Sequence, residues 1–95
     1  MIRNKKYQLT REEQREIAER CKKLDLLEQD LLLQAAREAN VGIADDLYYS
    51  LRRGLSYEEL GKRGCTFINK GDFYAYRRKA INIFYAALIL NGNTP

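Results

Sequence analysis

No proline interrupts the chain before its last residue, Pro95, so the sequence contains almost nothing that would break a helix from within. Apolar and polar residues do not alternate anywhere for long enough to indicate a β-strand. Apolar residues recur instead at spacings of three and four, which is the periodicity of an amphipathic helix. The sequence therefore predicts an all-α protein, and its 95 residues suffice for a single domain, 1–95.

Four helix-start signals divide this domain. In each, a side chain that can accept a hydrogen bond precedes a carboxylate by three residues, which satisfies free N–H groups at a helix start. The signals begin at Thr10, Asp25, Ser56 and Asn69. They predict a small helical bundle of about five helices, over 10–39 with a break favoured at 23–25, and over 44–53, 56–62 and 70–90.

The predicted helix ends fall on residues that tolerate a left-handed backbone conformation. Asn40 and Gly42 end the second helix, Gly54 ends the third, and the pair Asn91-Gly92 ends the last. These stops leave short connections, as expected for a compact bundle.

Helical spacing also predicts which side chains form the core. In the first stretch the apolar stripe consists of Ile17, Cys21, Leu24, Leu27, Leu31 and Ala35. Leucines 26, 32 and 33 lie off this stripe, so that region must be covered on several sides. In the later helices the expected core residues are Leu47, Tyr48, Leu51, Leu60, Phe73, Tyr76, Ala80, Ile83, Phe84 and Ala87.

Most enzyme chemistry is excluded by composition. The chain has no histidine, which removes imidazole catalysis and histidine–metal sites, and its two cysteines, Cys21 and Cys65, are too few for a zinc site. The adjacent acidic pairs lie near helix starts, where carboxylates stabilise the helix dipole. We therefore predict no catalytic residue, no metal and no cofactor.

A membrane location is not expected either. The longest apolar run, 83–90, is too short to span a bilayer, and the N-terminal residues contain no apolar stretch of signal-peptide length. With only two cysteines, a reducing, cytoplasmic location is favoured.

The charge is distributed unevenly along the chain. Residues 1–11 carry +4, residues 12–46 carry −5 and residues 47–95 carry +5, for a net charge of +4. This pattern predicts an acidic helical support region over 1–46 and a basic working region over 47–92.

The working region is arranged like a DNA-binding helix-turn-helix. A short capped helix, 56–62, is followed by a turn and by a longer helix from Asn69. On a helical wheel, one side of the longer helix collects small, polar and basic residues. These are Gly71, Tyr74, Ala75, Arg78 and Asn82, flanked by Lys70, Arg77 and Lys79.

Each residue type on this face suits a contact with double-stranded DNA. Lys70 and the helix N-terminus can meet phosphates, and Gly71 allows close approach to base edges. Arg78 can read guanine and Asn82 can read adenine with paired hydrogen bonds. Sequence-independent attraction would come from Arg52, Arg53, Lys62 and Arg63.

Two segments of this region are similar to a known family. The segments GLSYEEL (54–60) and INKGDFYAYRRKA (68–80) resemble the helix-turn-helix of sigma-factor region four. The similarity is greatest to small transcriptional regulators of phages and mobile elements, of the late-gene activator type, and covers 47–88. It implies DNA binding through the helix near Asn69, with Lys70, Tyr74 and Arg78 at contact positions. The turn between the two segments is longer than in that family, which bears on the angle between the helices.

Three alternatives are open at this stage. Helix-turn-helix units also serve as protein-binding modules, here with RNA polymerase or a host defence enzyme as partner. The leucine-rich first half would then present the partner surface; separately, the apolar surface of 24–36 would allow a homodimer. The motif GKRG (61–64) matches the GXXG loop of RNA-binding KH domains, although these also need a β-sheet. Cys65, beside Lys62 and Arg63, could have a lowered pKa, but a small buried side chain is the simpler interpretation.

Overall fold

A computed structural model describes residues 9–62 and 68–92. These residues form five α-helices and one 3₁₀ turn, and contain no β-strand. The elements are α1 (Arg11–Arg20), α2 (Leu26–Ala39), η2 (Val41–Ile43), α3 (Ala44–Arg53), α4 (Tyr57–Gly61) and α5 (Lys70–Leu90). The predicted all-α fold class is confirmed, and the absence of strands from the described residues removes support for the KH alternative.

All four predicted helix starts are present. Thr10, Asp25 and Ser56 each form a complete capping box, in which the cap side chain and the carboxylate three residues later exchange hydrogen bonds with the backbone. Asn69 accepts a hydrogen bond from the backbone N–H of Asp72 at 2.8 Å. The cap at Asp25 separates α1 from α2, so the favoured break in the first stretch is confirmed.

The predicted helix ends are correct in position but not all in conformation. Gly54 and Gly92 have φ values of 66° and 76°, the left-handed conformation that glycine adopts most easily. Asn40, in contrast, is extended, with φ −167° and ψ 107°, and Gly42 has no positive φ. The left-handed end predicted there is wrong, because Asn40 ends α2 by redirecting the chain. Its side chain then caps η2, accepting a hydrogen bond from the Gly42 N–H at 2.9 Å.

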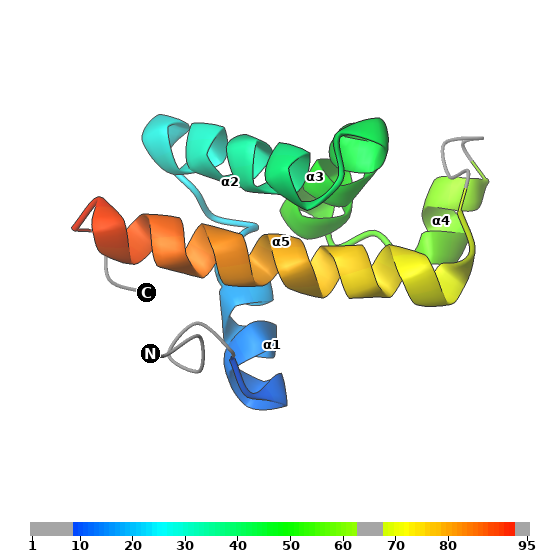
Figure 1. Ribbon diagram of the computed structural model, residues 1–95, viewed down its shortest axis with the longest axis horizontal. Coiled ribbons are helices and arrows are strands. Elements are labelled where there is room, and N and C mark those ends of the chain that lie inside the picture. The colour runs from blue at the N-terminus through cyan, green and yellow to red at the C-terminus, as the bar shows by residue number, and fades with distance from the viewer. Residues whose placement is uncertain (1–8, 63–67, 93–95) are drawn as a thin grey trace.

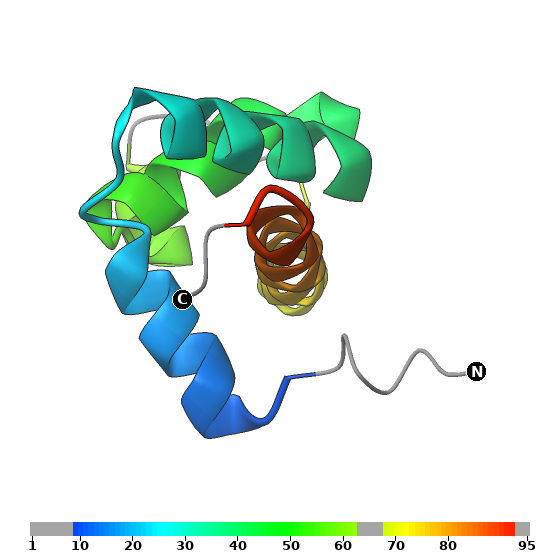
Figure 2. The ribbon, with the colours of Figure 1, turned by 90° about the vertical axis from the view of Figure 1, so that its left-hand side faces the viewer.

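Helix α5 is the central element of the bundle. Helix α2 packs along it, α3 packs on both, and α4 lies beside the first turns of α5 (Figure 1). Seen nearly along the axis of α5, α2 and α3 cover one side while α1 rises along a different side (Figure 2). No helix among the described residues is long and apolar enough to cross a membrane.

The buried face of α5 is rotated relative to the prediction. Phe73, Ala80 and Phe84 are buried as expected, whereas Tyr76, Ile83 and Ala87 are only half-buried. The side chains that replace them in the core are those of Ile81 and Leu88. The helical wheel was drawn for α5 alone and could not include α1. Because α1 packs on the side of α5 that carries Ile81, the buried face extends toward that side.

The predicted stripe of the first stretch holds only in part. Ile17, Cys21 and Leu24 are buried, but Leu27 is 56% exposed and Leu31 is half-buried. The break before Leu26 changes the helical phase, so α2 buries a different face. That face consists of Glu28, Leu32, Ala35, Ala36 and Ala39. On α3, Leu47 and Leu51 are buried and Tyr48 is half-buried.

Candidate nucleic-acid interface

Helices α4 and α5 are joined by aromatic packing and by two hydrogen bonds. The Phe73 ring is fully buried and lies 5.6 Å from the ring of Tyr57 on α4 and 5.4 Å from that of Tyr74. The Tyr57 hydroxyl donates to the Ile68 carbonyl at 2.6 Å, and its backbone N–H donates to the Tyr74 hydroxyl at 3.1 Å. These contacts hold α4 against the first turns of α5.

The opposite side of those turns faces solvent. Gly71, Ala75, Arg78 and Lys79 are all exposed, and a side chain added at Gly71 would meet only the Asn69 amide oxygen, at 3.5 Å. The single acid of α5, Asp72, lies at the helix start, whereas the helix carries four bases. This surface therefore combines small residues with positive charge.

Lys70 is exposed but already has an ionic partner. Its Nζ lies 2.6 Å from a carboxylate oxygen of Glu58 on α4. This hydrogen bond lowers the pKa of Glu58 below 4.5 and raises the pKa of Lys70 above 10.5, so both groups are charged at neutral pH. A phosphate would have to compete with Glu58 for this lysine.

The helical wheel predicted that Arg77 flanks the outer face of α5, and this prediction is wrong. Its side chain turns toward the core, where Nε donates to the Ser50 hydroxyl at 2.9 Å, and this hydroxyl donates in turn to the Leu55 carbonyl. Burial lowers the pKa of Arg77, opposed by Tyr74 and Cys21. The reason is the rotation of α5, which brings position 77 to the inner side.

Two other predicted contact residues are partly covered. Tyr74 is half-buried and its hydroxyl is engaged with the backbone of Tyr57. Asn82 is also half-buried, and its amide oxygen, fully shielded from solvent, has no hydrogen-bond partner among the described residues. Asn82 thus lies farther from solvent than Arg78.

The four residues predicted to attract DNA independently of its sequence lie in different environments. Arg52 is half-buried and donates to the Cys21 carbonyl at 2.9 Å, which fastens α3 to the end of α1. Arg53 is exposed, with its guanidinium carbon 5.4 Å from the centre of the Tyr49 ring. Lys62 is exposed at the end of α4, and Arg63 lies outside the described residues.

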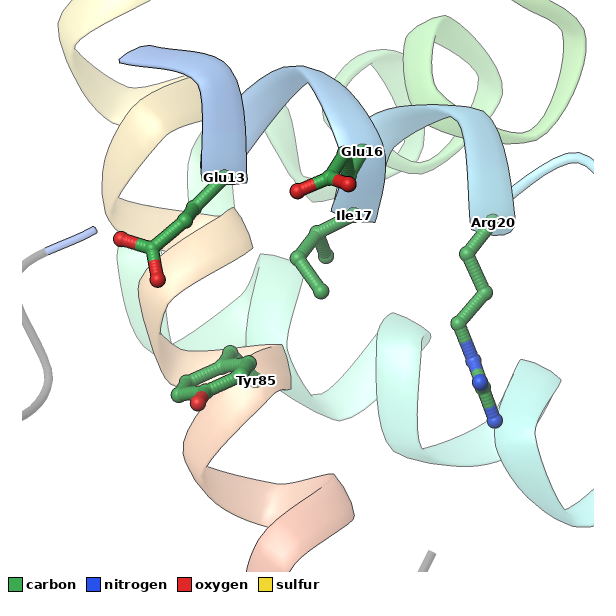
Figure 3. Close-up of a pocket in the computed structure, with 5 residues that line it drawn as sticks. All are labelled: Glu13, Glu16, Ile17, Arg20 and Tyr85. Atoms are coloured by element: carbon green, nitrogen blue, oxygen red, sulfur yellow. The ribbon is translucent and has the colours of Figure 1, made fainter. Parts of the chain in front are cut away.

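Two hollows of different charge lie between α1 and α5. The first is lined by Glu13, Glu16, Ile17 and Arg20 together with Tyr85, as Figure 3 shows. The second is a basic groove that consists of two adjoining parts. It is lined by Leu9, Arg11, Gln14, Arg15, Ala18, Glu19, Tyr74, Arg77, Arg78 and Ile81.

Arg11, Gln14 and Arg15 were not predicted to belong to any site. A pattern within α1 could not reveal them, because their significance depends on α1 lying beside Arg77 and Arg78. The one available signal was Arg11 itself, a cation at the first residue of a helix, where the dipole disfavours positive charge.

The described residues offer no metal-binding cluster of three or more His, Cys, Asp or Glu side chains. Cys21 is a buried free thiol, and burial raises its pKa to about 12, opposed by Arg77, Arg52 and Arg20. It is therefore a core side chain rather than a nucleophile. Cys65 and most of the GKRG motif lie outside the described residues.

No protein-family model, curated protein or solved structure matches the chain. The similarity to sigma-factor region four, and the helix-turn-helix assignment itself, therefore stay predictions that rest on the residues of 47–88.

Proposed function

We propose that the protein binds double-stranded DNA as a transcriptional regulator of phage or mobile-element type. The observation that carries the proposal is the solvent-facing side of the first turns of α5. There Gly71 and Ala75 leave room for close approach while Arg78 and Lys79 are exposed. A helix of this kind can enter the major groove, which is wide enough to admit it.

The contacts within the protein support a division of roles. Arg78 is exposed and forms no ion pair within residues 9–62 and 68–92, so it is suited to reading guanine with two parallel hydrogen bonds. Lys79 and Lys62 are suited to phosphates, which fix position without reading sequence. Phe73 and Tyr57 supply the rigid support that a recognition helix needs.

A specific observation favours protein docking as the second candidate function. The start of α2 and the end of α5 lie at the same end of the bundle, away from α4 (Figure 1). Four large apolar side chains are exposed at these helix ends: Leu26, Leu27, Ile89 and Leu90. Scattered apolar residues are normal on a surface, but a group of four at one end fits contact with RNA polymerase or with a second copy of the chain.

The test is the salt dependence of binding to a random-sequence duplex, measured by fluorescence anisotropy. Two phosphate contacts, from Lys62 and Lys79, give a slope of about −1.8 in log K against log salt, or about a 12-fold loss for a fourfold rise in salt. We expect the affinity for the duplex to fall by about this factor between about 50 and 200 mM salt.

A matched pair of variants shows whether α5 is responsible. Arg78→Gln should weaken binding, whereas Arg37→Gln, which removes another exposed arginine, from α2, should leave it unchanged. Wild-type protein that fails to bind DNA at low salt would refute the proposal and leave protein docking as the better function.

A further inference from the structure

The groove between α1 and α5 gathers positive charge from two distant parts of the sequence. Arg11 and Arg15 reach it from α1, and Arg77 and Arg78 reach it from α5. Its larger part has a volume of about 790 Å³, ample for a phosphate group and its hydration shell. We propose that this groove binds phosphate groups. In the DNA complex these phosphates belong to the backbone beside the bases that α5 reads, and this assignment rests on the proposed function.

The charge of the groove is not neutralised within the described chain. Arg11, Arg15 and Arg78 are exposed, and no ion pair joins them to an acid among the described residues. The one acid that lines the groove, Glu19, is 2.9 Å from Lys22. Arg20, by contrast, pairs with Glu28 at 2.6 Å. A phosphate would therefore meet Arg11 and Arg15, which are free to form paired, charge-assisted hydrogen bonds, while Arg78 stays available to a base in the DNA complex.

Arg77 gives the groove a fixed inner edge. Its Nε is held by the Ser50 hydroxyl, and no other hydrogen bond of this guanidinium is found within residues 9–62 and 68–92. Removal from water destabilises its charge, and an anion in the groove would offset that cost. Because Ser50 holds one nitrogen, the guanidinium plane is oriented before a ligand arrives.

Helix α1 is fastened in the position that forms the groove. Ile17 is buried in the core, and Arg52 donates to the carbonyl of Cys21 just after the helix. Arg20, at the last turn of α1, bonds Glu28 on α2 at 2.6 Å. The two arginine pairs are therefore presented by anchored helices, which reduces the entropy lost on binding.

Phosphate binding in the groove explains the position of Arg11. It is the first residue of α1, next to the cap Thr10, where the helix dipole favours acids. Glu12 and Glu13 follow that preference and Arg11 opposes it. A phosphate bound near this helix start would interact favourably with both the arginine and the dipole.

The first test uses inorganic pyrophosphate as probe and the ¹⁵N-labelled full chain at low ionic strength. The Nε–H signals of Arg11, Arg15, Arg77 and Arg78 should shift together, while that of Arg37 on α2 should not. The double variant Arg11→Gln/Arg15→Gln should bind pyrophosphate at least about tenfold more weakly, because two charge-assisted contacts are lost. Arg37→Gln should bind like the wild type, and amide spectra check that each variant is folded.

The second test uses a DNA duplex and separates the inference from the proposed function. Loss of one phosphate contact in Arg15→Gln should reduce the salt slope by about one, equivalent to about a fivefold loss at 0.15 M salt, on every sequence alike.

If pyrophosphate does not shift the Nε–H signals of the groove arginines, or shifts that of Arg37 equally, the groove is not a phosphate site, even if the protein binds DNA. Shifts at the groove without any DNA binding refute the proposed function and assign the groove to free phosphate compounds. DNA binding that is unchanged in Arg15→Gln, together with pyrophosphate binding, overturns the assignment of the groove to the DNA backbone.

Discussion

Replacing Phe73 by alanine tests the arrangement on which the proposed interface depends. The side chain has no exposed surface and packs between the rings of Tyr57 and Tyr74. Truncation removes its buried surface, leaves a cavity between α4 and α5 and abolishes two aromatic contacts. We expect the free energy of unfolding to fall by about 3–5 kcal/mol.

The loss can be measured by urea unfolding followed by circular dichroism. A chain of 95 residues has a stability of about 5–14 kcal/mol, so Phe73→Ala could leave little folded protein. Phe73→Leu, which keeps most of the volume, should cost about 1–2 kcal/mol and stays measurable. Tyr76→Ala is the control, because Tyr76 is half-buried on the same helix and should cost less than Phe73→Ala.

A loss below about 1 kcal/mol for Phe73→Ala would refute the reasoning. Phe73 would then lie on the surface, and α5 would be turned about its axis. Arg78 follows Phe73 by five residues, so the same turn would carry it away from the exposed face. The test of stability is therefore also a test of which side of α5 can meet DNA.

Three further predictions concern single side chains. Arg78→Ala should cost about 1–3 kcal/mol on a preferred DNA site and relax the preference at one base pair, as measured on a panel of mismatched duplexes. Glu58→Gln should release Lys70 for a phosphate, raising DNA affinity about fivefold at 0.15 M salt and steepening the salt slope by about one; unchanged binding would show that Lys70 faces no phosphate. The pKa of Cys21, raised from 9.0 to about 12, means that the folded state keeps a proton that the unfolded state loses. Stability should therefore fall as pH rises from about 9 toward 12, by up to about 1.4 kcal/mol per pH unit, and urea unfolding of Cys21→Ala should lack this component.

Helix boundaries were predictable because the signals that set them are local. The cap at Asp25 and the stop at Gly54 involve residues within a few positions of each other, and both are present in the structure. Asn40 shows the limit of such signals. Its amide can permit a left-handed residue or cap the next turn, and the burial of Ile43 and Ala44 immediately afterwards requires the second arrangement.

Burial was less predictable because it depends on neighbours that are distant in the sequence. A wheel drawn for α5 alone places Arg77 on the margin of the polar side, since it contains no information about Ser50 on α3. Likewise, a stripe drawn through the break between α1 and α2 predicted that Leu27 would be inside, although the interruption changes the phase. Both errors have one cause: helical periodicity gives the width of a face but not the direction from which other helices cover it.

The same reasoning explains why half of the basic groove was missed. Within the sequence, Arg11 and Arg15 belong to a segment that reads as support, and the acids that follow in 12–46 outweigh their charge. Folding places most acids and bases of α1 on different sides, with Glu13 and Glu16 toward Tyr85 and the two arginines toward Arg77 and Arg78. Arg20 lies on the first side and Glu19 on the second, so the first side carries a net negative charge and the second a net positive charge. Net charge per segment therefore conceals a helix with two electrically distinct flanks. If the groove binds phosphate, α1 contributes directly to the interface, and the division of the chain into a support region and a working region no longer holds.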